Sequence, residues 1–185
     1  LPDIVPGAPG QYIEVTSRPN ERLKKDSLGS SGVELLRYDT ETQDGVTTEH
    51  ATLFATAQGL GRLRAKVQQF ENENTADREK DGQVIPGRPR NADLVQSMAA
   101  IVEAGLRALW RGPQEKFPAA DGSVFWEIWL EPSRAAAFIA QAAAMQVEIG
   151  ADRLDFPEDI VVVGRATQAA LALAVRRSGS VRALA

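Results

Sequence analysis

The sequence predicts an α+β fold. Short segments rich in β-branched and aromatic residues alternate with amphipathic helical segments, and turn-forming residues separate them. Over residues 124–185 these elements follow one another in the regular order β-α-β-β-α-β. The first half of the chain is less regular and is expected to form a layer of three strands and two helices.

The N-terminal half begins with an arm at residues 1–10, because prolines and glycines there prevent a helix. Strands are expected at residues 11–18, 33–40 and 49–56, since each of these segments is short, partly alternating and β-branched. The turn-like Gln43-Asp44-Gly45 precedes the third strand. These strands begin a first subdomain that is expected to cover residues 11–112.

Two helices are expected in this subdomain, separated by a loop. Apolar residues at helical spacing predict the first helix over residues 59–74. Residues 75–90 are charged and broken by Gly and Pro, which predicts an exposed, mobile connection. Asn91 is expected to cap the longest helix, which continues along an apolar face to Trp110 before Gly112-Pro113 ends it.

The C-terminal subdomain, residues 124–185, has the clearer pattern. Its expected elements are a strand at 124–131, a helix after Pro132 that Ser133 caps, an extended segment at 147–156, a strand at 159–164, a helix capped by Thr167 and an extended segment at 180–184. Phe138, Met145, Leu171 and Val175 are expected to point inward from the helices. With this order, two helices can cover one face of a four-stranded antiparallel sheet, which is the ferredoxin-like arrangement.

Composition excludes several classes of protein. The chain has 185 residues, no cysteine and a net charge of -4 with the two signs interspersed, so neither a disulfide framework nor a nucleic-acid footprint is expected. No apolar run approaches the roughly 18 residues that span a bilayer, so no membrane partner is expected. The lack of cysteine favours the cytoplasm over secretion, although the first residue is not Met and a preceding signal is not visible.

No catalytic constellation is apparent, and no cofactor or metal site is predicted. His50 is the only histidine and lacks a nucleophile elbow, so a solvated strand histidine is the simpler interpretation. The carboxylates of residues 152–159 lack the spacing of a calcium loop, which favours a solvated turn. Gly59-Leu60-Gly61 precedes a helix without the third glycine of a dinucleotide site.

Two tryptophans in the aromatic strand raise a further question. Trp126 and Trp129 are three positions apart, so they should point to opposite faces of a sheet. Either one lies in the core while the other lines an interface, or both are buried beneath other elements.

Four short segments of the sequence carry a family resemblance: QYIEVTSRP at residues 11–19, GVELL at 32–36, FWEIWL at 125–130 and LDFPE at 154–158. They resemble the N-terminal, prodomain-like region of large bacterial subtilisin-like (S8) serine peptidases, some of which are linked to anti-phage defence. The resemblance spans nearly the whole chain, but these motifs are strands and turns. The sequence contains no Asp-Ser-Gly or Asp-Thr-Gly, no Gly-His-Gly-Thr and no Gly-Thr-Ser-Met, which are the motifs of the catalytic domain of that family.

The resemblance implies a non-catalytic accessory module that acts as folding chaperone or inhibitor of a subtilisin-like protease domain. The sheet would pack on that domain, and the tail would enter its substrate cleft. Residues assigned to this possible interface are the acidic turn with Asp155, Glu158 and Asp159, followed by Val181, Arg182, Ala183, Leu184 and Ala185.

The alternatives are a sensor or recruitment domain that controls when the protease acts, a free-standing binding module, and a free-standing small-molecule or metal-dependent enzyme. The catalytic groups of such an enzyme would have to be carboxylates, Tyr12, Tyr38 and lysines. The tail imposes one constraint: residues 181–184 are needed for the fourth strand and cannot also lie in a cleft. An inhibitory tail is therefore expected to continue beyond Ala185, and the present chain is expected to bind a protease but to inhibit it weakly.

Overall fold

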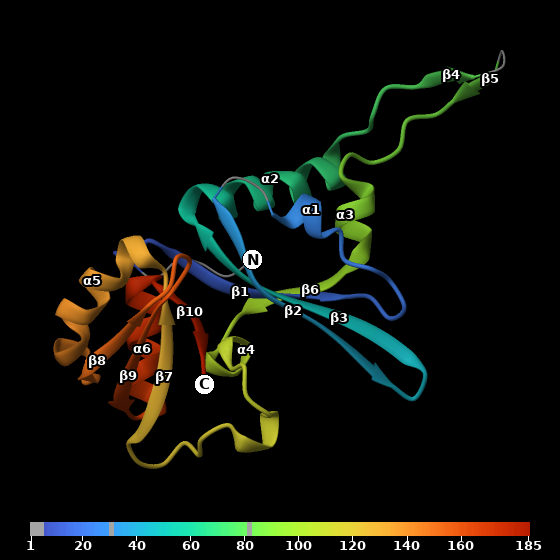
Figure 1. Cartoon of the computed structure of the whole chain (residues 1–185). Helices are drawn as coiled ribbons and strands as arrows, with labels where there is room; N and C mark the ends of the chain where they lie inside the picture. Colours follow the sequence, from blue (N-terminus) through green and yellow to red (C-terminus); the bar gives the residue numbers. More distant parts are fainter. Residues whose placement is uncertain (1–5, 30–31, 81–82) are drawn as a thin grey trace. The chain divides into compact units, whose positions relative to one another are not determined.

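The computed structural model describes residues 6–29, 32–80 and 83–185. The chain is α+β, as the sequence predicts, and its registered strand pairs are antiparallel. It divides into two compact units (Figure 1). The first comprises Glu14–Val102, and the second comprises Glu103–Ala185 with the described part of Pro2–Ile13. Half of the predicted N-terminal arm, residues 1–5, lies outside the described residues.

A four-stranded sheet with the order β2-β3-β1-β6 forms the centre of the first unit. Its strands are β1 (Gly10–Ser17), β2 (Val33–Gln43), β3 (Val46–Thr56) and β6 (Met98–Glu103). The predicted turn joins β2 and β3, because Asp44 and Gly45 both adopt the positive φ that a tight hairpin requires.

The predicted helix over residues 91–110 is wrong. The segment forms α3 (Ala92–Ser97), strand β6 and α4 (Leu106–Leu109), so the sheet has four strands where three were expected. The apolar run from Met98 to Val102 fits a buried helix or a strand equally well, and pairing with β1 decides in favour of the strand. Asn91 has a left-handed backbone and makes no capping bond; its side chain instead donates to the Lys66 carbonyl.

The remaining helices of this unit are α1 (Lys25–Leu28) and α2 (Ala57–Asn72). Thr56 caps α2 by accepting a hydrogen bond from the Gly59 amide, and Leu60 and Leu63 are buried. Gly59 permits a close approach of two backbones, since a Cβ at this position would lie 2.1 Å from the carbonyl oxygen of Gly32.

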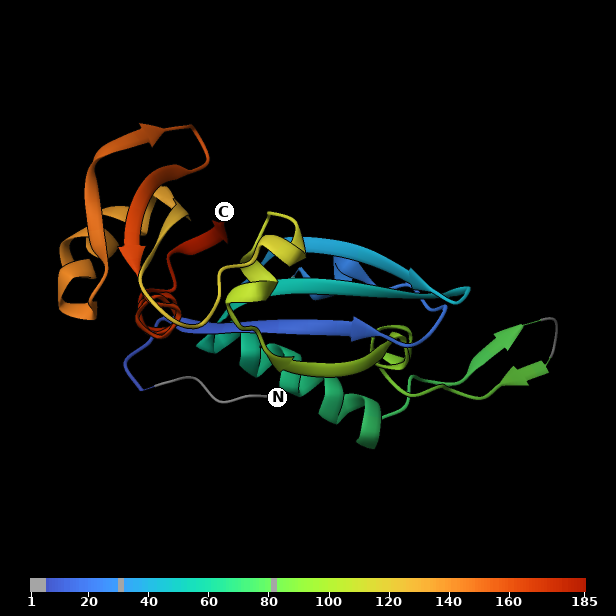
Figure 2. The same cartoon turned by 90° about the horizontal axis from the view of Figure 1, so that it is seen from below.

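The connection at residues 75–90 is exposed but contains a two-stranded hairpin that the sequence analysis did not anticipate. Strands β4 (Arg78–Lys80) and β5 (Gln83–Ile85) pair, and Figures 1 and 2 show them extending beyond the end of α2. Ion pairs of Arg88 with Asp93 and of Arg90 with Glu73, each 2.8 Å long, hold its base.

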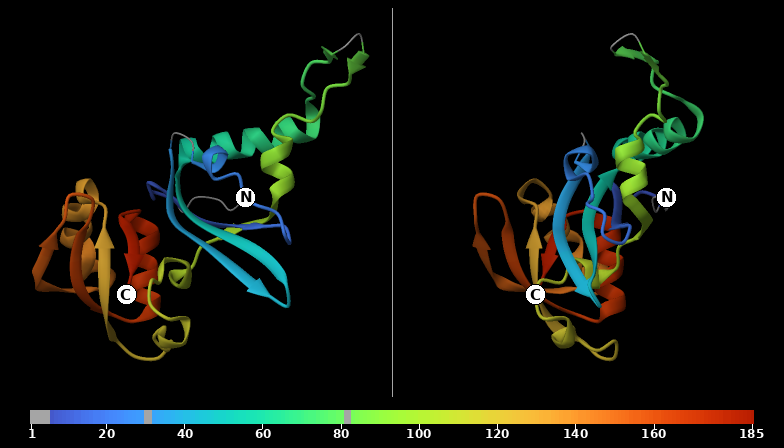
Figure 3. Two further views of the ribbon diagram at one scale, coloured as in Figure 1. Left: turned by 45° about the vertical axis from the view of Figure 1, so that its right-hand side comes forward. Right: turned by 90° about the vertical axis from the view of Figure 1, so that its right-hand side faces the viewer.

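The second unit contains the predicted order β-α-β-β-α-β. Its elements are β7 (Val124–Leu130), α5 (Pro132–Ala142), β8 (Glu148–Asp155), β9 (Ile160–Ala166), α6 (Gln168–Ser178) and β10 (Val181–Leu184), with short 3₁₀ turns at Gln114–Lys116 and Ala143–Met145. The strands form one sheet in the order β10-β7-β9-β8, with antiparallel neighbours throughout. Both helices lie on the same face of this sheet (Figure 3).

The core of the second unit lies between the sheet and these helices. Alternate residues of β7 are fully buried: Trp126, Ile128 and Leu130. Phe138, Met145, Leu171 and Val175 are buried as predicted. Thr167 caps α6 as predicted, whereas α5 is capped by Glu131 rather than Ser133, because Glu131 accepts hydrogen bonds from the Arg134 amide and the Ser133 hydroxyl.

Replacing Leu171 with Asp is expected to unfold the second unit. Leu171 is fully buried, and an unpaired carboxylate in that layer costs several kcal/mol, comparable with a typical domain stability of roughly 5 to 15 kcal/mol. Leu173→Asp is the matched control, because Leu173 lies on the same helix and is 42% exposed. Thermal denaturation followed by circular dichroism distinguishes the two, and equal melting temperatures would contradict this assignment of the inward face.

The Glu131 cap is expected to make stability depend on pH. Burial raises the pKa of this carboxyl, but hydrogen bonds from Ser133 and Arg134 outweigh burial and leave the pKa below its usual value. A lowered pKa contributes stability above the unfolded pKa of about 4.3, and the contribution is lost as the pH falls through the folded value. Urea unfolding should therefore show Glu131→Gln to be less stable at pH 7 by roughly 0.3 to 1 kcal/mol, the usual contribution of a negative charge at a helix N-terminus. That difference should shrink towards pH 3, and a pH-independent difference would contradict the account.

Candidate docking surface

The face of the second unit's sheet that points away from α5 and α6 carries an apolar surface. Residues directly opposite one another in antiparallel strands share a face. The pairs Phe125 with Arg165, Glu127 with Val163, Trp129 with Val161 and Leu154 with Val161 therefore lie together on this outer face.

The outer face is open to solvent over much of its apolar area. Phe125 is 73% exposed and Leu154 is 61% exposed, while Phe156 and Val163 are about half exposed. Single exposed apolar residues are ordinary on protein surfaces, but several on one sheet face mark a candidate interaction site. We call this set, Phe125, Trp129, Leu154, Phe156 and Val163, the outer-face patch.

Trp129 is held rigidly within the patch. The rings of Trp129 and Phe156 stack with their centroids 6.1 Å apart and 6° between their planes. The Arg111 guanidinium lies 5.0 Å from the Trp129 ring centre, and the indole Nε1–H donates to Glu127 Oε1 over 2.7 Å. Because these contacts fix its orientation, Trp129 would lose little side-chain freedom on binding.

The two tryptophans point to opposite faces, as their spacing predicts. Trp126 is fully buried beneath the helices, and its indole N–H donates to the Ala166 carbonyl. Trp129 is only half buried, so the alternative in which both are buried is wrong.

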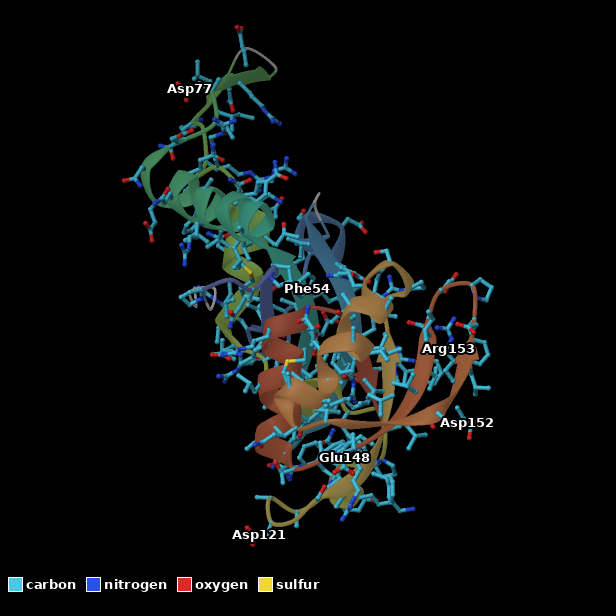
Figure 4. All side chains as sticks on the ribbon, turned by 90° about the vertical axis from the view of Figure 1, so that its left-hand side faces the viewer. Phe54, Asp77, Asp121, Glu148, Asp152 and Arg153 are labelled. Atoms are coloured by element: carbon cyan, nitrogen blue, oxygen red, sulfur yellow. The ribbon has the colours of Figure 1, made fainter. Side chains whose placement is uncertain are left out.

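The predicted acidic turn lies at the end of the same sheet. The Phe156 amide donates to the Asp159 carbonyl and closes the turn between β8 and β9. Asp155 pairs with Arg153 over 2.9 Å. Glu158 is exposed, and Asp152 and Arg153 lie on the edge strand β8 (Figure 4).

Arg182 connects this turn to the predicted tail. Its guanidinium donates to the Glu158 carbonyl and lies 3.5 Å from the Asp159 carboxylate. One basic residue thus partly neutralises the acidic turn, a pairing that the sequence alone did not indicate.

The other predicted tail residues lie in β10, which completes the sheet as the sequence analysis expected. Val181, Ala183 and Leu184 are buried, so their side chains hold the strand in place rather than forming part of the surface. Ala185 is exposed, and its N–H and C=O both bond to the backbone of Glu127.

Sequence reasoning missed most of the outer-face patch. In the sequence, Phe125 and Leu154 stand out only within the motifs that carry the family resemblance, and Val163 only within a strand. One signal was available: residues 124–130 are apolar at every position except Glu127, whereas a strand with one solvated face should alternate.

His50 lies in the first unit, on strand β3. Its Nδ1 is 3.6 Å from a Glu14 carboxylate oxygen and its Nε2 is 3.9 Å from one of Glu41. It is a partly solvated strand histidine, the simpler of the sequence interpretations. Across residues 6–29, 32–80 and 83–185, no group of three or more histidine, cysteine or carboxylate side chains is placed to hold a metal ion.

No protein-family model matches the chain, and no curated protein sequence matches it. In the described part of the chain, no helix combines the length and apolar character needed to cross a membrane.

The chain is expected to lack hydrolase activity, because His50 has two carboxylates as neighbours and, among the residues that the structure describes, no hydroxyl nucleophile is paired with it. Chain purified free of contaminating proteases should therefore release no product from fluorogenic peptides or nitrophenyl esters. His50→Ala should leave that background unchanged. Turnover that disappears on this substitution would contradict the prediction.

Proposed function

We propose that this chain is the non-catalytic N-terminal accessory region of a subtilisin-like serine protease, and that its second unit docks on the protease domain. The observation that carries the proposal is the outer-face patch, an apolar sheet surface opposite the face that α5 and α6 cover. The resemblance noted in the sequence supplies the identity of the partner.

The architecture of the second unit supports this proposal. Two helices on one face of an antiparallel sheet ordered β10-β7-β9-β8 support a ferredoxin-like assignment, the arrangement that the resemblance to a subtilisin propeptide implies. In this arrangement the helices leave the outer face of the sheet uncovered, and this flat surface is available to a partner. We assign residues 124–185 to this prodomain-type subdomain.

Docking would be driven by burial of the outer-face patch. Each Å² of apolar surface removed from water contributes about 25 cal/mol, and rigid aromatic residues at the centre of an interface usually carry most of its energy. Phe125 and the stacked pair Trp129 and Phe156 fit that role. A module that binds only the folded protease domain stabilises it, which is the thermodynamic basis of a folding chaperone.

The acidic turn would help to set the orientation in which the second unit docks. The exposed carboxylate of Glu158 suits a surface where helix N-termini present unpaired N–H groups. Asp155 contributes less, because Arg153 pairs with it. Asp159 also contributes less, because Arg182 lies beside it.

The hairpin β4–β5 favours a second role, sensing or recruitment. Val84 is 69% exposed on this extended element, and its partner strand carries Arg78 and Glu79. An exposed hairpin of this kind can contact a further protein while the second unit remains on the protease.

The proposal is tested by adding each variant to a separately produced bacterial subtilisin-like protease domain. Phe125→Glu and Leu154→Glu place charges in the outer-face patch and should weaken binding about 10- to 100-fold, as expected for central interface residues. Binding is measured by titration calorimetry with the protease serine replaced by alanine, and inhibition by peptide hydrolysis.

Leu173→Glu is the matched control, since it places the same charge on an exposed leucine of α6. It should bind as the unmodified chain does. Equal affinity of all variants would contradict docking through the outer face. Absence of binding by the unmodified chain would contradict the accessory role on the protease and favour recruitment.

A further inference from the structure

The last strand of the second unit is held at its outer edge by groups that are not part of the sheet. Strand β10 is an edge strand with β7 as its neighbour. Beside the pair of Val181 with Leu130, the Glu131 amide donates to the Ser180 carbonyl. In an antiparallel ladder this pattern makes the N–H and C=O of Val181 point away from β7.

The Tyr12 hydroxyl bonds to both of these outward groups. It donates to the Val181 carbonyl over 2.8 Å and accepts from the Val181 amide over 3.0 Å, in a fully buried position. One hydroxyl thus replaces the missing neighbour strand, and it comes from a residue 169 positions earlier in the chain. We call these two hydrogen bonds the Tyr12 clasp.

A second contact holds the other end of β10. The Arg111 amide donates to the Leu184 carbonyl over 2.8 Å, beside a parallel bridge between Trp110 and Leu184. Between the two contacts the register of β10 shifts at Arg182, so the ladder to β7 is interrupted there. A short strand with a bulge has few bonds of its own, which makes the outer contacts important for keeping it in the sheet.

We propose that Tyr12 is a positioning residue that keeps residues 181–185 in the sheet, and that opening of the Tyr12 clasp releases them as an extended segment which a protease cleft can bind by strand addition. Extended peptides bind such sites through main-chain hydrogen bonds, and those groups are occupied while β10 is paired. The functional half of this inference rests on the proposed docking function. The structural half is independent of it.

Hydrogen exchange measured by NMR tests the clasp without any partner. Tyr12→Phe removes only the hydroxyl and leaves the buried N–H and C=O of Val181 without it. Loss of such a buried bond corresponds to about a 10- to 100-fold change in the opening equilibrium. The amides of Val181 and Ala185 should exchange faster by that factor, while those of β7 and β9 remain protected. Tyr38→Phe, the matched change at the second tyrosine, should leave β10 unaffected.

The unmodified chain provides a measurement that does not depend on a variant. Its Val181 and Ala185 amides should exchange through a local opening with a smaller denaturant dependence than the amides of β7. Exchange of β10 together with β7 in the unmodified chain, or a uniform loss of protection in Tyr12→Phe, would make Tyr12 an ordinary core residue and overturn the inference.

The functional half is tested with the active protease domain. Cleavage within residues 180–185 follows the population of the open strand, so Tyr12→Phe should be cut about 10- to 100-fold faster than the unmodified chain. Faster exchange without faster cleavage would overturn strand addition. The Phe125→Glu binding data decide separately whether the outer face docks.

Discussion

The rest of the second unit depends on one constraint: both of its helices cover the same face of a four-stranded sheet. The buried residues Trp126, Ile128 and Leu130 form the layer beneath α5 and α6. The opposite face is then left to solvent, although β7 carries Phe125 and Trp129 there. Strand β7 is therefore apolar on both faces, although the helices cover only one of them. The docking proposal explains this feature, because a partner protein would bury the apolar residues of the outer face.

The edge strand β10 adds a second constraint, because a buried backbone group requires a partner. Tyr12 and Arg111 satisfy the outward groups of Val181 and Leu184, so this edge of the sheet is closed. The opposite edge, β8, carries exposed charged residues, including Glu148 and Arg153, and a register shift. Such edges resist pairing with other strands. Both edges therefore leave the outer face as the main surface for a partner of this unit.

The sequence predicted the second unit well and the first unit less well, for a physical reason. In residues 124–185 the turns and apolar periods agree with one another, so local signals suffice for the elements, whereas the cap of α5 is Glu131 and not Ser133. Residues 91–110 carry an apolar period that suits a helix, but pairing of β6 with β1 outweighs it, and such long-range pairing is invisible locally. The Tyr12 clasp joins residues 169 positions apart and has no sequence signature. Most of the outer-face patch was missed because a strand apolar on both faces resembles a fully buried one.

The most direct test of the central claim is a methyl NMR footprint of the chain bound to a subtilisin-like protease domain whose catalytic serine is replaced. The methyl groups of Leu154 and Val163 lie on the outer face, whereas those of Leu173 lie on the exposed side of α6. The account predicts that the signals of Leu154 and Val163 shift or broaden on titration while those of Leu173 stay unchanged. Perturbation of Leu173 with unchanged signals from Leu154 and Val163 would contradict it.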